Sequence, residues 1–88
     1  MNAITKQTDR FTEADIDAEI VIMRLDTGDF FSLSGSSAAI WRLIDGQRDR
    51  ASLLRALANE FQGDEAVMAT DVDEFMARLR DMDLLAKA

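Results

Sequence analysis

The sequence contains no cysteine and no histidine. Without a thiol or an imidazole, the chain cannot form disulfides, thiolate nucleophiles, zinc sites with sulfur and nitrogen ligands, or histidine acid–base catalysts. It also lacks the glycine-rich motifs that cradle phosphate groups, since its four glycines are isolated. The composition therefore predicts no metal site and no cofactor.

Basic residues are scarce, with ten Lys and Arg against seventeen Asp and Glu and a formal net charge of −7. Binding to nucleic acid needs clustered basic residues, so this balance argues against it. It fits a basic peptide partner or a surface that is acidic for solubility. No apolar run has the length of a signal peptide or a membrane span, and we expect a cytoplasmic protein without a membrane partner.

The acidic residues are numerous, but no arrangement of them indicates catalysis. A two-carboxylate active site needs a concave pocket that shifts pKa values, and a chain of 88 residues has one modest core. The Asp-Thr-Gly-Asp stretch is too short for a calcium loop, which needs about twelve residues. We therefore expect a protein that is not an enzyme.

Proline is absent, and no repeat or low-complexity tract divides the chain. Residues 1–9 are polar and are expected to be flexible. Residues 10–88 then form a single domain.

A β-hairpin is the clearest local feature. Ala18–Leu25 carries apolar residues on both faces of a period-two pattern, which favours a covered strand. Asp26-Thr27-Gly28 suits a tight turn, and Asp29–Leu33 is the returning strand. A further strand before this hairpin is expected within residues 10–17.

Three helices are predicted after the hairpin. Candidate N-caps precede each of them: Ser34, Ser36 or Ser37 for the first, Asp49 for the second and Asp64 for the third. Gly46 and Gly63 are expected to end the first two. The apolar stripes are Ile40, Trp41 and Ile44; Leu53, Leu57 and Phe61; and Met68, Val72, Phe75, Leu79 and Met82, with Met76 beside the last. Three strands followed by three helices predict a winged-helix-like α+β domain.

One strand of a three-stranded ribbon must lie at an edge, where N–H and C=O groups are unpaired. The segment Asp29–Ser34 has no Lys or Pro that would block such an edge, and an extended peptide could add to it as a strand. Phe31 and Leu33 share one face, which we expect to build the core. Phe30 and Ser32 share the other face, and Phe30 is the better candidate for a contact.

The third helix is strongly acidic. Between Asp64 and Asp83 it carries seven acids against two arginines. Such a helix beside a strand edge would attract a basic extended peptide, and it would equally serve to solubilise the protein. The sequence leaves both interpretations open.

The stretch from Glu19 to Leu85 resembles the family of PQQ-biosynthesis protein D, also called precursor-peptide recognition elements of ribosomally made, modified peptides. The matching residues are Thr27, Gly28, Leu33, Ile40, Trp41, Asp45, Gly46, Leu57, Phe61, Asp71, Val72, Phe75 and Leu79. Ser34, Met76 and Asp83 stand where the family usually has Asn, Leu and Gly. Asp tolerates left-handed geometry less well than Gly, so the final turn is expected to differ.

The resemblance implies a winged-helix-like fold without catalysis of its own. It implies that a precursor's leader peptide binds as an extra strand on the third β-strand, in a cleft shared with the third helix. The protein would then present the leader to a maturation enzyme, either a lasso-peptide leader protease or a PQQ-type radical SAM enzyme. The segment Phe30–Ile44 looks closer to the stand-alone lasso-peptide proteins. Carried over by position, the peptide-binding residues are Asp29, Phe30, Phe31, Ser32, Leu33, Ser34, Met68, Asp71, Val72, Phe75, Arg78 and Leu79.

Two other functions compete with this one. A winged-helix DNA-binding regulator could use Arg48, Arg50 and Arg55, although the net charge opposes it. An acidic carrier protein would need a modifiable Ser in an Asp-Ser-Leu context, which is absent. An open edge strand allows a monomer or a weak or swapped dimer, and the sequence does not decide between them. Nor does it separate the core residues of the third helix from those that face a cleft.

Overall fold

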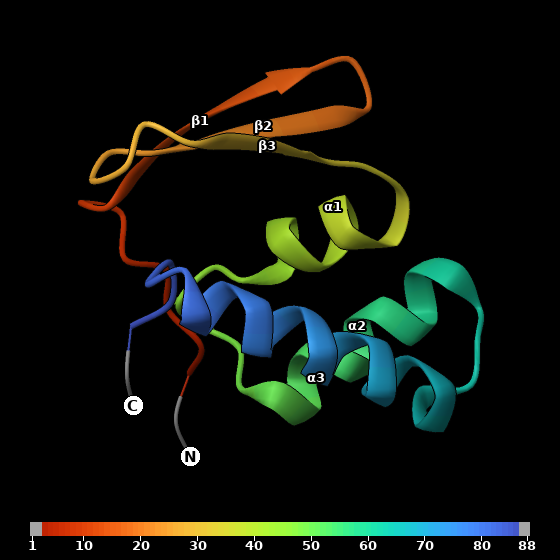
Figure 1. Ribbon diagram of the computed structural model, residues 1–88. Coiled ribbons are helices and arrows are strands. Elements are labelled where there is room, and N and C mark those ends of the chain that lie inside the picture. The colour runs from red at the N-terminus through yellow and green to blue at the C-terminus, as the bar shows by residue number, and fades with distance from the viewer. Residues whose placement is uncertain (1–2, 87–88) are drawn as a thin grey trace.

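The computed structural model describes residues 3–86 and divides them into a block of strands and a block of helices (Figure 1). The strands are β1 (Phe11–Ile16), β2 (Glu19–Arg24) and β3 (Phe30–Leu33). The helices are α1 (Gly35–Leu43), α2 (Arg50–Phe61) and α3 (Glu65–Asp81). The predicted α+β order is confirmed.

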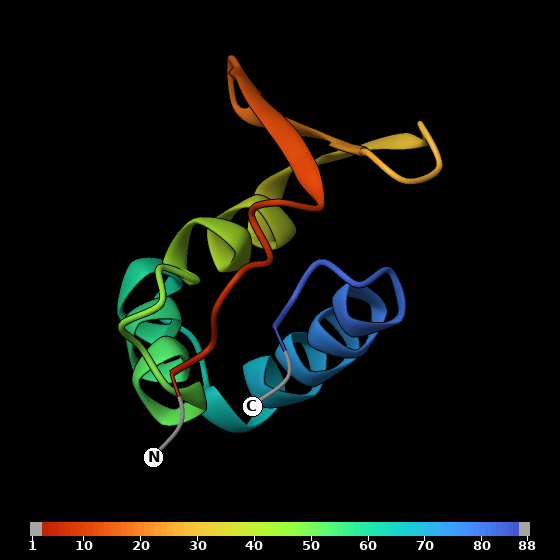
Figure 2. The ribbon, with the colours of Figure 1, turned by 90° about the vertical axis from the view of Figure 1, so that its left-hand side faces the viewer.

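The strands form one antiparallel sheet in the order β1-β2-β3, so β1 and β3 are its two edges. Side chains alternate between the faces of a strand. Phe11, Ile20, Ile22 and Leu33 are buried on the inner face, whereas the alternate residues of the outer face are mostly exposed. All three helices lie on the inner side, with α1 directly beneath the sheet and α2 and α3 farther away (Figures 1 and 2).

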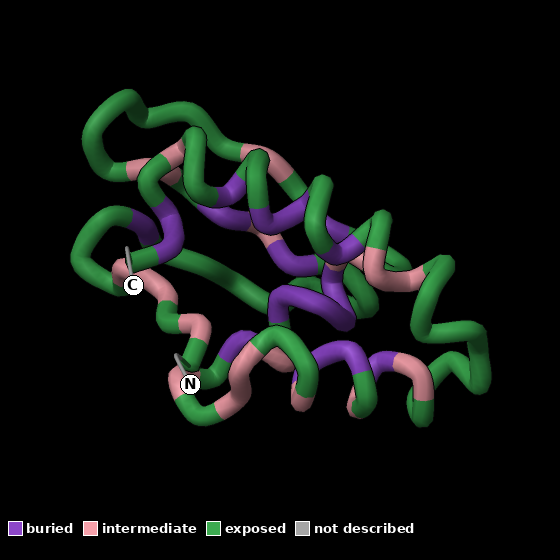
Figure 3. The backbone as a smooth tube through the Cα atoms, turned by 90° about the horizontal axis from the view of Figure 1, so that it is seen from below, coloured by how far each residue is buried: buried purple, intermediate pink, exposed green. Residues whose placement is uncertain are grey.

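Trp41 of α1 lies at the centre of the core and is fully buried. Its ring meets Phe11 edge-on, with 5.2 Å between the centroids. Its Nε1–H donates to Glu13 Oε2 over 2.8 Å, and the Lys6 ammonium lies 4.2 Å from the ring centroid. Buried segments gather where the elements face one another (Figure 3). The predicted core role of Trp41 is confirmed.

The helix ends follow the predicted caps in part. The carboxylates of Asp49 and Asp64 cap α2 and α3 through the N–H groups of Ser52 and Ala66, as expected. Two predicted glycine stops are wrong. Helix α1 ends at Leu43, before Gly46, and the left-handed residue after α2 is Gln62 rather than Gly63. Gly63 lies against the flexible end of the Met68 side chain.

The predicted apolar face of α2 is correct only in its first two turns. Leu53 and Leu57 are buried, but Phe61 is 46% exposed, and Leu54 is buried in addition. Phe61 is the last residue of α2, so it lies at the end of that helix, next to the connection to α3. Periodicity shows which face of a helix is apolar, but it does not show which residues along that face are covered by the rest of the protein.

Residues 4–7, within the stretch that the sequence predicts to be flexible, are hydrogen-bonded to two distant parts of the chain. The N–H of Ile4 donates to the Arg48 carbonyl, and the Ile4 carbonyl accepts from Gly46, both in the α1–α2 connection. On its other side, Thr5 and Gln7 bond to the backbone of Leu84–Ala86. Figure 2 shows this segment running between the two. Residues 1–2 and 87–88 lie outside the described part of the chain.

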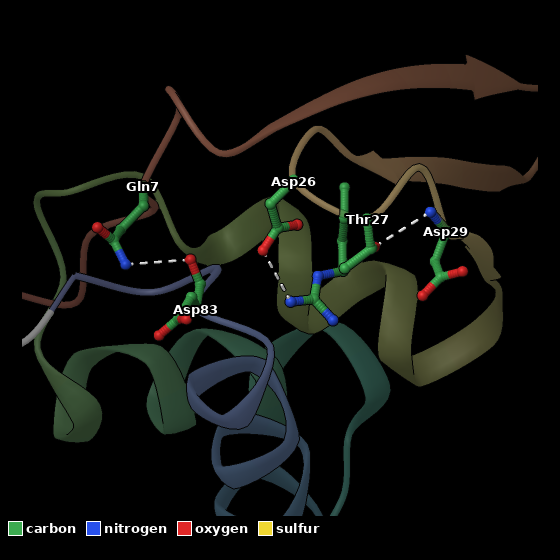
Figure 4. A network of polar contacts seen from close by, with 6 residues as sticks. Gln7, Asp26, Thr27, Asp29 and Asp83 are labelled. Atoms are coloured by element: carbon green, nitrogen blue, oxygen red, sulfur yellow. Dashed lines mark hydrogen bonds and ion pairs between the residues drawn. The ribbon is translucent and has the colours of Figure 1, made fainter.

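The chain turns sharply after α3. Asp83 has a left-handed φ of 59°. This is the backbone geometry that the usual glycine of the family would favour, so at this residue the turn does not differ in the way expected from the sequence. The Asp83 carbonyl accepts from Gln7 Nε2 at 3.0 Å (Figure 4). This turn brings Leu84 and Leu85 into the core. Among residues 3–86, no helix is both long and apolar enough to cross a membrane.

Candidate functional site

Within residues 3–86, strand β3 has no neighbour on its outer side, and its backbone is the first element of the site. The Arg24 amide donates to the Asp29 carbonyl over 2.8 Å, which makes these residues a bonded pair. Bonded and non-bonded pairs alternate along an antiparallel ladder. The N–H and C=O groups of Phe30 and Ser32 therefore point away from β2, toward the open edge.

The turn before β3 is held by local polar contacts. Gly28 has a φ of 76°, and its N–H donates to the Arg24 carbonyl over 2.9 Å. Thr27 Oγ1 accepts from the Asp29 N–H at 3.2 Å (Figure 4), and Arg24 pairs with Asp26 at 3.2 Å. These contacts fix the residue at which β3 begins, and hence which backbone groups face outward.

A groove of about 460 Å³ lies between β3 and the second half of α3; we call it the β3–α3 groove. Its lining residues are Phe31, Ser32, Leu33, Ser34, Ser37, Phe75, Arg78 and Met82. An adjoining cavity of about 270 Å³ is lined by Ser36, Ile40, Asp71 and Glu74 and shares Ser37, Phe75 and Arg78 with the groove. Because they share these three residues, the groove and the cavity are neighbours along α3, and together we call them the depression.

The groove is chemically uneven. Its apolar lining comes from Phe31 and Leu33 on β3 and from Phe75 and Met82 on α3. Its polar lining comes from Ser32, Ser34, Ser37 and Arg78. Such a surface suits the side chains of an extended peptide that alternate toward it, because apolar groups gain by burial and polar groups find hydrogen-bond donors.

Helix α3 is anchored on its other side by an exposed ion pair. Arg50 donates to both carboxylate oxygens of Asp73, at 2.8 and 2.9 Å. The hydrogen bond from Arg50 lowers the pKa of Asp73 below its usual value. Both side chains are about half exposed, so the pair adds little stability and mainly restrains the geometry of α2 and α3.

Six of the predicted site residues line the groove: Phe31, Ser32, Leu33, Ser34, Phe75 and Arg78. Asp71 lines the adjoining cavity. Phe30 is 74% exposed on the outer face of the sheet, beside Met23 on β2. Phe31, expected in the core, is half-buried: it packs against the core and lines the groove.

Four predicted site residues need correction. Val72 and Leu79 are fully buried, so they are core residues and offer no surface to a ligand. Met68 lies beside Gly63, at the other end of α3 from the groove. Asp29 uses both its N–H and its C=O within the hairpin.

Sequence reasoning missed two groove residues, Ser37 and Met82. Met82 follows Phe75 by seven residues on the same stripe but was not among the predicted peptide-binding residues. Ser37 was considered only as a helix cap. No sequence signal distinguished the groove side of either helix.

The family model of coenzyme PQQ synthesis protein D (PqqD) matches residues 19–85. The chain belongs to the PqqD family. This match confirms the resemblance noted in the sequence. A comparison with curated proteins found no significant match.

Two solved structures share the fold of this PqqD-family protein. TbiB1, solved in complex with the TbiA(beta) leader peptide, is 27% identical, with a TM-score of 0.83 over 92% of this chain and 94% of that chain. Lasso peptide synthetase B1, solved with its leader peptide, is 14% identical, with a TM-score of 0.82 over 97% and 99% of the two chains. The second similarity concerns the fold alone. The predicted three-strand, three-helix fold is confirmed.

Proposed function

We propose that this PqqD-family protein is a non-catalytic adaptor that binds the leader peptide of a ribosomally made, modified peptide. The leader adds to β3 as a fourth strand, with alternate side chains in the β3–α3 groove. The adaptor then presents the leader to a maturation enzyme in the cytoplasm. The observation that carries the proposal is an unpaired β3 edge directly beside a partly apolar groove.

The energetics of this mode are adequate. The outward N–H and C=O groups of Phe30 and Ser32 provide up to four backbone hydrogen bonds, each contributing about 0.5–1.5 kcal/mol net. One or two apolar leader side chains against Phe31 and Phe75 add burial. Ordering a flexible segment costs about 2–5 kcal/mol or more. We expect dissociation constants from micromolar to tens of nanomolar, or about −8 to −10 kcal/mol.

The similarity to TbiB1 supports leader-peptide binding, because TbiB1 was solved in complex with a leader peptide and is 27% identical to this chain. The segment Phe30–Ile44, which resembles the stand-alone lasso-peptide proteins, favours a lasso-peptide pathway. The enzyme partner would then be a leader protease, with a PQQ-type radical SAM enzyme as the other candidate. Since the proposed leader covers the open edge, the adaptor is expected to act as a monomer once loaded.

The DNA-binding alternative gains no support. Arg48 and Arg50 pair with Asp45 and Asp73, at 2.7 and 2.8 Å, so their charges are already compensated. The net charge of −7 would repel a phosphate backbone.

The test is a titration with a fluorescein-labelled synthetic leader from the precursor gene that neighbours this protein's gene. Anisotropy should give a dissociation constant in the range above, and the core segment of the same precursor, as control, should bind at least tenfold more weakly. Absence of leader binding at high micromolar concentration would refute the adaptor function.

A further inference from the structure

We propose that Arg78 is a specificity-determining residue, which binds a carboxylate carried by the leader strand. The inference rests on the proposed function and deepens it, because it names the chemistry of one leader side chain. An edge strand forms hydrogen bonds only with the backbone of an added strand, so it does not select for side chains. Apolar walls discriminate weakly between apolar side chains. A single charge in the groove can therefore contribute more selectivity than the rest of its surface.

Arg78 occupies a central place in the depression. It lies in the last turn of α3 and lines both the β3–α3 groove and the adjoining cavity. It is the one charged residue among those that line the groove. The protein has seventeen acidic residues, yet none of them lines the β3–α3 groove.

Within the described part of the chain, the guanidinium of Arg78 forms no ion pair with an acidic residue. Four arginines pair with carboxylates at 3.3 Å or less, and Arg78 is not among them within residues 3–86. Glu74 and Asp71 lie one and two turns earlier on α3 and line the adjoining cavity, yet neither forms an ion pair with Arg78. Arg78 thus keeps its donors for a ligand.

The remaining polar lining can also donate. Ser34 and Ser37 carry hydroxyls and line the groove, whereas the side chain of Ser32 points to the outer face of the sheet. Ser34 precedes α1, but its side chain makes no capping hydrogen bond, so this hydroxyl is not used by the helix. A guanidinium with nearby hydroxyls matches an acceptor with two oxygens, and charge-assisted bonds of this kind are the strong ones.

The sheet geometry restricts where the leader carboxylate can be. Successive side chains of an added strand alternate between the faces, so only residues beside Phe31 or Leu33 point into the groove. Neighbouring leader residues lie beside Phe30 and Ser32 and point outward. We expect an acidic residue at one inward position and an apolar residue two positions away.

The experiment is a peptide array of the neighbouring precursor's leader in which each position is replaced in turn by Asp, Asn or Lys. It is probed with the wild-type protein, Arg78→Gln and Arg80→Gln. Arg80 is the matched control, because it lies in the same last turn of α3 but lines a different cavity, with Arg50 and Asp73. The two variants remove the same charge from the same helix end, and thermal melts check that both remain folded.

The wild-type protein should prefer Asp over Asn by about tenfold or more at one inward position, as expected for a charge-assisted bond. Arg78→Gln should abolish this preference, and Arg80→Gln should retain it. A preference that survives in Arg78→Gln, or its absence at every position, would overturn the inference while leaving leader binding intact. If the unsubstituted leader does not bind the wild-type protein, the proposed function itself fails.

A charge reversal gives an independent check. Arg78→Glu should weaken the Asp-containing leader at least tenfold and should bind the Lys-substituted leader better than the wild-type protein does. If Lys at that position brings no recovery, the contact with Arg78 is not direct.

Discussion

The two edges of the sheet differ in what they present to an approaching strand. At the β1 edge, the Leu25 amide donates to the Arg10 carbonyl, so the alternating pattern turns the backbone of Phe11, Glu13 and Asp15 outward. Two of these three carry a negative charge. At the β3 edge, the outward backbone belongs to Phe30 and Ser32, which carry none.

The acids of β1 also point toward the inner face, where they are engaged. Glu13 accepts from Trp41 and Asp15 pairs with Arg42 at 3.3 Å. Inward-pointing charges are a recognised means of blocking an edge strand. The same sheet therefore has one guarded and one open edge, and the open edge is the one that borders the groove. This asymmetry directs an added strand to β3.

The largest expected effect comes from closing the open edge. Ser32→Pro removes an outward N–H without breaking a bond to β2, so the fold should persist while leader affinity falls about ten- to hundredfold. Asp15→Pro makes the same change at the β1 edge and should leave affinity within twofold. Anisotropy titrations measure both. An equal loss of leader affinity in the two variants would mean that the leader does not prefer the β3 edge over the β1 edge.

The second prediction removes a contact at the guarded β1 edge, the hydrogen bond between Glu13 and Trp41. Glu13→Ala leaves the buried Trp41 N–H without its partner and should destabilise the fold by about 1–2 kcal/mol in urea unfolding. Glu13→Gln keeps an acceptor and should cost less. If the two variants were equally stable, the bond to Trp41 would not matter to the fold.

A third, smaller effect concerns the exposed side chain at the open edge. Phe30 is 74% exposed, so Phe30→Ser should change stability by less than about 0.5 kcal/mol. Its cross-strand contact with an added strand is worth about 0.2–1 kcal/mol, so affinity should fall up to about fivefold. Met23→Ser, on the same outer face but one strand inward, is the control and should not affect binding.

The smallest effect involves the helix caps rather than either edge. Hydrogen bonds from Ser52 lower the pKa of Asp49 below its usual value. A depressed carboxyl pKa contributes stability above the unfolded pKa of about 3.9, and this stability is lost as pH falls through the lower folded pKa. Asp49→Asn should therefore show a smaller decrease in melting temperature between pH 6 and pH 3 than the wild type. An identical decrease would contradict this role.

Local signals predicted the parts of the fold that local chemistry decides. The Asp26-Thr27-Gly28 turn and the caps at Asp49 and Asp64 are found as expected, because each depends on residues close in sequence. The bonds of residues 4–7 to the distant Gly46–Arg48 and Leu84–Ala86 segments left no local pattern. A polar terminal stretch looks the same whether or not a remote segment accepts its hydrogen bonds.

The site was predicted at the level of elements rather than side chains. Residues of both predicted walls, β3 and α3, line the β3–α3 groove. Periodicity placed Val72 and Leu79 on the same stripe as Phe75, yet only Phe75 reaches the groove. A helical stripe spans a wide arc, and how much of it the neighbouring layer covers depends on tertiary packing.

Amide hydrogen exchange followed by NMR, with and without the leader peptide, tests the central claim most directly. If the leader adds to the open edge, the amides of Phe30 and Ser32 should gain protection on binding, while those of Phe11, Glu13 and Asp15 remain unchanged. Protection at the β1 edge, or none at Phe30 and Ser32 with saturating leader, would contradict strand addition to β3.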